Sequence, residues 1–181
     1  MNPSASLPIG IFDSGMGGLT VLKAISSRLP GENLLYLGDT ARLPYGTKSR
    51  DTIIRYTLKA AGRLVDEGVK MLVVACNTAT SAAIHDLREA YPDTIVIGIE
   101  PALKLAYDRY HGGGIGVMAT PMTLREEKFE ALMHRYDQSC RIYKIPAPGL
   151  VELVERAVLA VAGLDEPPEQ NFVKKHTDQE R

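Results

Sequence analysis

The sequence has no tryptophan, only two cysteines, and no cluster of lysine and arginine anywhere in its 181 residues. Its 21 basic and 22 acidic side chains nearly cancel, so nothing indicates the basic surface that nucleic-acid binders carry. No apolar run approaches the roughly 20 residues of a membrane-spanning helix, and the first residues lack the pattern of a signal peptide. We therefore expect a cytoplasmic protein without a nucleic-acid or membrane partner.

The two cysteines, Cys76 and Cys140, lie far apart and show no CxxC spacing. In a chain without an export signal, such cysteines are expected to be reduced rather than bridged. No group of cysteine, histidine and carboxylate residues has the spacing of metal ligands, so we expect no metal site.

Short apolar runs alternate with longer amphipathic stretches along the chain. The expected strands cover residues 8–12, 33–37, 69–76, 94–99, 114–119 and 141–145. Short strands that alternate with longer helices are typical of βαβ units. The predicted fold class is therefore α/β with a mostly parallel sheet.

The chain divides by composition into three parts. We expect a first α/β lobe at residues 1–99 and a partial second α/β lobe at 100–162. Residues 163–181 are polar, contain a Pro-Pro pair and have no apolar period, so we expect a disordered tail without further strands.

Two helices have residues at their expected boundaries that are typical of helix ends. Ser49 is placed to cap a helix that begins at residue 50, and Gly68 is placed to end it. Thr120 followed by Pro121 is the expected cap and first residue of a later helix.

Polar residues follow several of the expected strands. Ligands of open parallel sheets bind beyond the carboxyl ends of the strands. The candidates there are Asp13, Ser14, Asp39, Tyr45, Gly46, Cys76, Asn77, Thr78, Thr120 and Thr123.

The turn DSGMGG at residues 13–18 allows two interpretations. Its glycines and the following helix favour an anion, and the pattern is an incomplete nucleotide-binding fingerprint because Thr20 stands where a third glycine belongs. A nucleotide-binding α/β domain, with Asp39 as the ribose-binding acid, is therefore a weaker alternative. The simpler interpretation is a tight turn in which Asp13 caps the helix.

Cys76 ends an apolar strand and begins a helix. A free cysteine in such a place is often a small buried hydrophobe. A helix N-terminus lowers the pKa of a thiol, however, so the position also favours a nucleophile or an acid/base. None of the four histidines follows a strand to serve as its base. The remaining interpretation is a thiol that accepts and donates a proton.

The motifs IGIFDSGMGGLTVL, LGDTARLPYGTKS, VVACNTATSAA, IGIEPALKLA and GVMATPMTL occur in that order. Together they closely resemble the N-terminal part of bacterial glutamate racemases, within the aspartate/glutamate racemase superfamily. The resemblance implies a cofactor-independent isomerase of two similar lobes that interconverts L- and D-glutamate for peptidoglycan synthesis. Two thiols would exchange protons on opposite faces of Cα.

The resemblance also implies roles for individual residues. Cys76 would be the acid/base that acts on D-glutamate, and Asp13 would bind substrate and assist the proton transfer. The remaining substrate-binding residues would be Ser14, Tyr45, Gly46, Asn77, Thr78, Thr120, Thr123 and Glu155. Glutamate is the expected partner, and a homodimer is an open alternative.

One family feature is absent. The second catalytic cysteine of the family lies in a GCTHYP-like motif, which this sequence lacks, and family chains continue past residue 181. Cys140 precedes an expected strand and is assigned a structural role. The second lobe is therefore expected to be incomplete. A truncated, catalytically impaired fragment is the main alternative, and an aspartate racemase-like activity is a weaker one.

Overall fold

The computed structural model describes residues 6–109, 113–136, 140–162 and 171–175. The strands are β1 (Ile9–Asp13), β2 (Leu34–Gly38), β3 (Met71–Val74), β4 (Ile95–Gly98), β5 (Gly114–Ala119), β6 (Arg141–Pro146) and β7 (Asn171–Lys175). The helices are α1 (Leu19–Arg28), α2 (Arg50–Asp66), α3 (Asn77–Ala90), α4 (Leu103–Arg109), α5 (Glu127–His134) and α6 (Leu150–Ala162). Short 3-10 turns are η2 (Thr40–Arg42), η3 (Tyr45–Thr47) and η4 (Thr123–Arg125).

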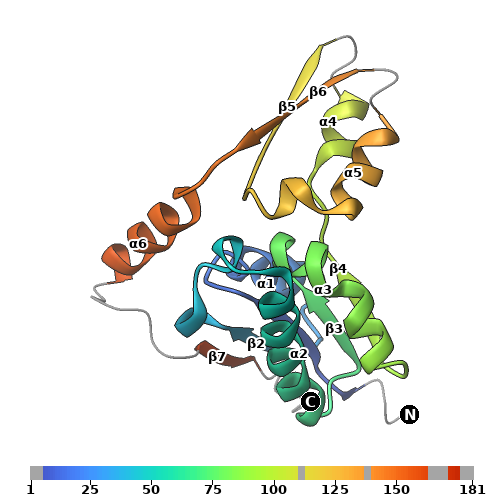
Figure 1. The fold of residues 1–181 in the computed structure, drawn as a ribbon. Coiled ribbons are helices and arrows are strands. Elements are labelled where there is room, and N and C mark those ends of the chain that lie inside the picture. Colours follow the sequence, from blue (N-terminus) through green and yellow to red (C-terminus); the bar gives the residue numbers. More distant parts are fainter. Residues whose placement is uncertain (1–5, 110–112, 137–139, 163–170, 176–181) are drawn as a thin grey trace.

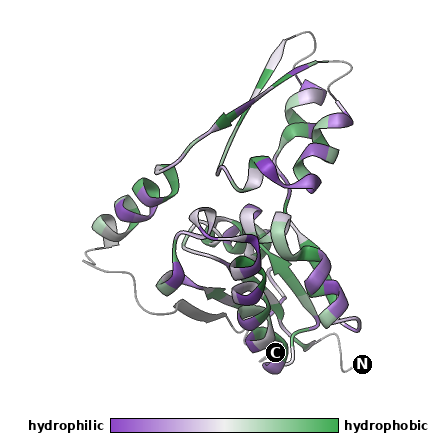
Figure 2. Cartoon of the chain, in the orientation of Figure 1, coloured by the Kyte–Doolittle hydropathy of each residue, from purple (hydrophilic) through white to green (hydrophobic). Residues whose placement is uncertain are grey.

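The main sheet has the strand order β4-β3-β1-β2-β7, and β1 to β4 run parallel. Successive residues of a strand face opposite sides, so each buried strand packs on both faces. Phe12 and Leu37 contact residues of α2 and α3, whereas Ile11 and Tyr36 contact residues of α1. The result is a three-layer arrangement in which strands β1 to β4 are mainly hydrophobic, as Figures 1 and 2 show.

A second, parallel sheet consists of β5 and β6. One of its faces packs on α4, η4 and α5 around Leu103, Val117 and Phe129. This small layer lies beside the carboxyl ends of the main strands (Figure 1). Parallel strands joined by helices confirm the predicted fold class; the lobe boundary at residues 99 and 100 stays a prediction.

The strand β7 was not expected from the sequence. It pairs antiparallel with β2, from Gly38 opposite Asn171 to Leu34 opposite Lys175. Without it, β2 would present unpaired N–H and C=O groups along one edge, which favours the addition of another strand. The expectation of a tail without strands is therefore wrong at residues 171–175, while 163–170 and 176–181 lie outside the described residues.

The expected helix boundaries have different outcomes. The Ser49 side chain accepts a hydrogen bond from Thr52 N, and Gly68 has a positive φ of 78°, so both ends of α2 are confirmed. The helix expected from Pro121 is wrong, because α5 begins only at Glu127, after η4. The Thr120 hydroxyl does accept from Thr123 N, but Glu126 has extended backbone and interrupts the helix.

Within the described residues, no helix combines the length and the apolar character needed to cross a membrane.

Candidate active site

The carboxyl ends of β1, β3 and β5 open onto one cavity of about 720 Å³, and residues of α6 form part of its wall. The residues to which the family resemblance assigned a catalytic or substrate-binding role all line this cavity: Asp13, Ser14, Tyr45, Gly46, Cys76, Asn77, Thr78, Thr120, Thr123 and Glu155. The structure thus brings them together from distant parts of the chain. Their individual roles remain predictions.

Cys76 is the N-cap residue of α3, directly after β3, and its side chain is buried. Its Sγ lies 3.1 Å from Ser14 Oγ and accepts a hydrogen bond from Ala79 N at 3.4 Å. Burial, and to a smaller extent the charge of Asp13, raise the pKa of the thiol to about 11 against the opposing hydrogen bonds. The prediction of a lowered pKa is therefore wrong, because desolvation outweighs the helix N-terminus.

Asp13 ends β1 and is also buried. Its Oδ2 accepts a hydrogen bond from Gly18 N at 2.7 Å, so the carboxylate closes the turn that leads into α1. Burial is the largest cause of its raised pKa, and hydrogen bonds from Gly18, Ser14 and Gly15 oppose it. A side chain at Gly18 would place Cβ 2.6 Å from the Asp13 Cβ, which explains the glycine there.

Three threonine hydroxyls meet where the two sheets approach each other. Thr78 Oγ1 on α3 lies 3.3 Å from both Thr120 Oγ1 and Thr123 Oγ1, and the latter two are 3.0 Å apart. A Cβ at Gly46 would lie 2.7 Å from Thr120 Cγ2, so only glycine allows the η3 loop to approach so closely. Hydroxyls can donate and accept, and this group can therefore bind either a carboxylate or an ammonium.

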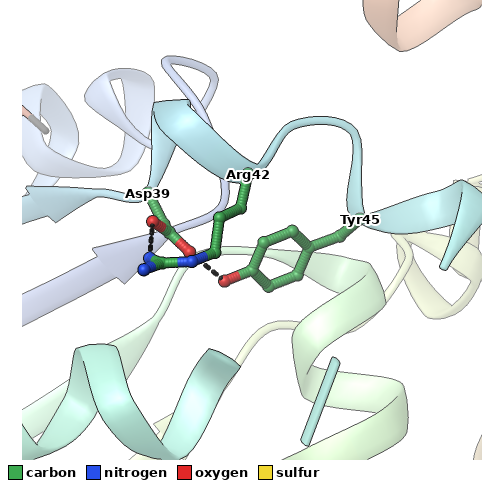
Figure 3. A network of polar contacts seen from close by, with 3 residues as sticks. All are labelled: Asp39, Arg42 and Tyr45. Atoms are coloured by element: carbon green, nitrogen blue, oxygen red, sulfur yellow. Dashed lines mark hydrogen bonds and ion pairs between the residues drawn. The ribbon is translucent and has the colours of Figure 1, made fainter. Parts of the chain in front are cut away.

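The loop after β2 is fixed by the network in Figure 3. Tyr45 donates its hydroxyl hydrogen to Asp39 Oδ2 at 2.7 Å, and Arg42 contacts Asp39 Oδ1 at 2.6 Å. Asp39 is fully buried, and both of its oxygens have protein partners. It does not line the cavity, so the nucleotide interpretation loses its ribose-binding acid.

Glu155 reaches the turn after β1 from α6. Its Oε1 and Oε2 accept from Met16 N at 3.0 and 3.3 Å. Behind the same turn, the buried Tyr36 donates its hydroxyl hydrogen to Gly15 O at 2.7 Å. The sequence analysis missed Tyr36, because it sits inside an apolar strand and carries no signal of its own.

Cys140 lies away from the cavity, and its thiol donates to Tyr136 O at 3.5 Å. Within the described residues, no group of three or more histidine, cysteine, aspartate or glutamate side chains could hold a metal ion.

No protein-family model matches the chain. A glutamate racemase from Bifidobacterium animalis subsp. lactis is 50% identical to it over 158 residues, which are 86% of this chain and 61% of the relative. Over 84–86% of its length, this chain is similar to glutamate racemases. It spans about three fifths of the length of such relatives.

Solved structures agree with this relation. The glutamate racemase of Francisella tularensis in complex with D-glutamate is 36% identical, with a TM-score of 0.75 over 86% of this chain and 58% of that one. The Escherichia coli glutamate racemase, in complex with L-glutamate and the activator UDP-MurNAc-ala, is 32% identical. Its TM-score is 0.76 over 89% of this chain and 60% of that one.

Proposed function

We propose that this protein is a cofactor-independent glutamate racemase that interconverts L- and D-glutamate for peptidoglycan synthesis in the cytoplasm. The observation that carries the proposal is the position of the Cys76 thiol, beside Ser14 and in one cavity with Thr78, Thr120 and Thr123. The related structures with bound D-glutamate and L-glutamate support the same substrate here. A homodimer stays a prediction.

Cys76 would exchange the proton on one face of the substrate Cα. The α-proton of an amino acid is only weakly acidic. Its removal at neutral pH therefore needs a strong base. A thiol whose pKa is raised to about 11 is a strong base once it is ionised. The ammonium group of an entering amino acid favours that ionised form, because an opposite charge stabilises a thiolate.

The polar groups around Cys76 would hold the substrate. We assign the ammonium and carboxylate groups of glutamate to Asn77, Thr78, Thr120 and Thr123. Hydroxyls already arranged in this way need little reorganisation as charge develops at the reacting carbon. Asp13 would assist the proton transfer, since its charge acts on the Cys76 thiol.

Racemisation also needs an acid/base on the opposite face of Cα. Cys140 does not line the cavity, so it does not supply that group in this arrangement. The alternative of a catalytically impaired fragment gains no support from the comparisons over the racemase itself. An intact racemase and an impaired fragment are distinguished by measuring proton exchange separately with each enantiomer of glutamate.

The test is proton exchange in D₂O. The purified chain is incubated with D-glutamate and, separately, with L-glutamate, while deuterium at Cα and chirality are measured. We expect Cys76-dependent deuterium uptake from D-glutamate, which Cys76→Ala abolishes and the control Cys140→Ser retains. Inversion to the other enantiomer would demonstrate a second acid/base. Equal exchange by the wild type and Cys76→Ala would refute the proposal.

A further inference from the structure

Helix α6 forms a wall of the cavity but is poorly packed. None of its described side chains is buried, and Leu153 and Val154 are 65% and 50% exposed. Figure 1 shows α6 standing apart from the helices that cover both sheets. Its place beside the turn after β1 therefore needs an explanation other than an apolar core.

The Glu155 carboxylate provides such a contact. Both of its oxygens lie within hydrogen-bonding distance of Met16 N, and a Cβ at Gly15 would lie 2.3 Å from Oε1. The glycine thus leaves room for the carboxylate against the backbone. A hydrogen bond from a backbone N–H to an ionised carboxylate is among the stronger kinds in proteins.

The opposite side of the same peptide unit is also held. Gly15 O and Met16 N belong to one peptide, and in a trans peptide the C=O and N–H point in opposite directions. Tyr36 donates to Gly15 O at 2.7 Å from the interior, so the Met16 N–H is directed outward to Glu155. Hydrogen bonds at both ends of a peptide strengthen each other.

We propose that Tyr36 and Glu155 are positioning residues that clamp the Gly15–Met16 peptide from both sides. The clamp docks α6 onto the turn and holds Ser14, the neighbour of Gly15, at 3.1 Å from the Cys76 thiol. Its effect on catalysis rests on the proposed racemase function, whereas the docking itself does not. Glu155 then acts through the turn and not by contact with glutamate.

The docking is tested by hydrogen exchange of the Met16 amide and of α6. Glu155→Met removes the acceptor, and Tyr36→Phe removes the inner hydrogen bond. We expect Glu155→Met to exchange the Met16 amide about tenfold faster, since hydrogen bonds to charged groups contribute at this level, and Tyr36→Phe, which loses a neutral hydrogen bond, to exchange it faster by a smaller factor. Glu152→Met on the same helix and Tyr91→Phe, whose hydroxyl donates to Leu58 O, are the matched controls.

The decisive measurement is the double variant. Because both side chains act on one peptide, the second substitution should add little to the first. The clamp would be refuted if the increases in the Met16 exchange rate of the two single variants multiplied fully in the double variant. An unchanged Met16 exchange rate in Glu155→Met would also refute it. Thermal melts test whether Tyr36→Phe is folded. If Tyr36→Phe does not fold, the exchange rate of the Met16 amide in Glu155→Met, a substitution on an exposed helix, tests the clamp by itself.

Glutamate exchange in D₂O gives the catalytic readout. We expect kcat to fall several-fold in Glu155→Met with little change in KM, and Glu155→Gln, which keeps an acceptor oxygen, to restore most of it. A raised KM that Gln does not restore, together with normal Tyr36→Phe kinetics, would assign Glu155 to direct substrate binding instead. If the wild type exchanges no glutamate, the proposed function fails, while the amide measurements still decide the clamp.

Discussion

The Cys76 thiol should titrate near pH 11 in the ligand-free protein, above its ordinary pKa of 9.0. Burial is the main cause, and the neighbouring Asp13 charge adds to it. The difference corresponds to about 3 kcal/mol of free energy against the thiolate. At pH 8 only about 0.1% of the thiol should be ionised, compared with about 10% for an ordinary cysteine.

The assay is alkylation by iodoacetamide as a function of pH in Cys140→Ser, which leaves Cys76 as the single thiol. The rate should rise toward pH 11 without a plateau near 9. Ser14→Ala should move the midpoint upward, because it removes a hydrogen bond that lowers the pKa, and Asp13→Asn should move it downward. A midpoint at or below 9 would refute the burial argument and restore a thiol activated by the helix N-terminus.

The same shift has a consequence for stability. A group whose pKa is higher in the folded state stabilises the fold fully below its unfolded pKa and loses that contribution as the pH rises through the folded value. The protein should therefore lose about 3 kcal/mol of stability from this group between pH 9 and 11. Cys76→Ala should lack that part of the alkaline loss in urea unfolding measured across this range.

Three further outcomes follow from the packing. Tyr45→Phe should cost about 1–3 kcal/mol in urea unfolding, because it leaves an oxygen of the buried Asp39 without its 2.7 Å partner; equal stability would contradict this. Gly46→Ala should lower exchange from D-glutamate, since its Cβ would meet Thr120 at 2.7 Å; unchanged kinetics would show that the loop yields. Val173→Pro should increase aggregation measured by light scattering, because it interrupts the pairing of β7 with β2; an equally monodisperse protein would show that the edge needs no cover.

Much of the fold was predictable because its signals are local. The six expected strands form, and Ser49 and Gly68 bound α2, since caps and apolar periodicity are properties of neighbouring residues. The start of α5 was not predictable from Thr120, because a threonine can cap a short turn as well as a helix. Strand β7 depends on an open edge far away in sequence, which no local pattern reports.

The candidate site likewise has features that the sequence could predict and features that it could not. Most of its members were predictable because parallel strands place the residues that follow them at one edge of the sheet, whereas Glu155 on α6 was named only from the family resemblance. The sign of the Cys76 pKa shift was not, since the depth of burial depends on how the other elements pack around it. The contact between Met16 and Glu155 was not predictable either, because the two residues are 139 positions apart. The hydrogen bond from the Tyr36 hydroxyl to the same turn was missed because Tyr36 lies within an apolar strand.

The distribution of charge in the cavity argues for the kind of ligand that it accepts. Burial disfavours the ionised forms of both Asp13 and Cys76, and the Asp13 charge further opposes a thiolate. A cation between them would relieve both penalties, whereas an anion would increase them. On the side of Thr78, Thr120 and Thr123 the described groups are neutral hydroxyls, which can donate to a carboxylate without such a penalty. Under the proposed function, the ammonium of the bound amino acid would lie toward Cys76, where its charge stabilises the thiolate that removes the α-proton.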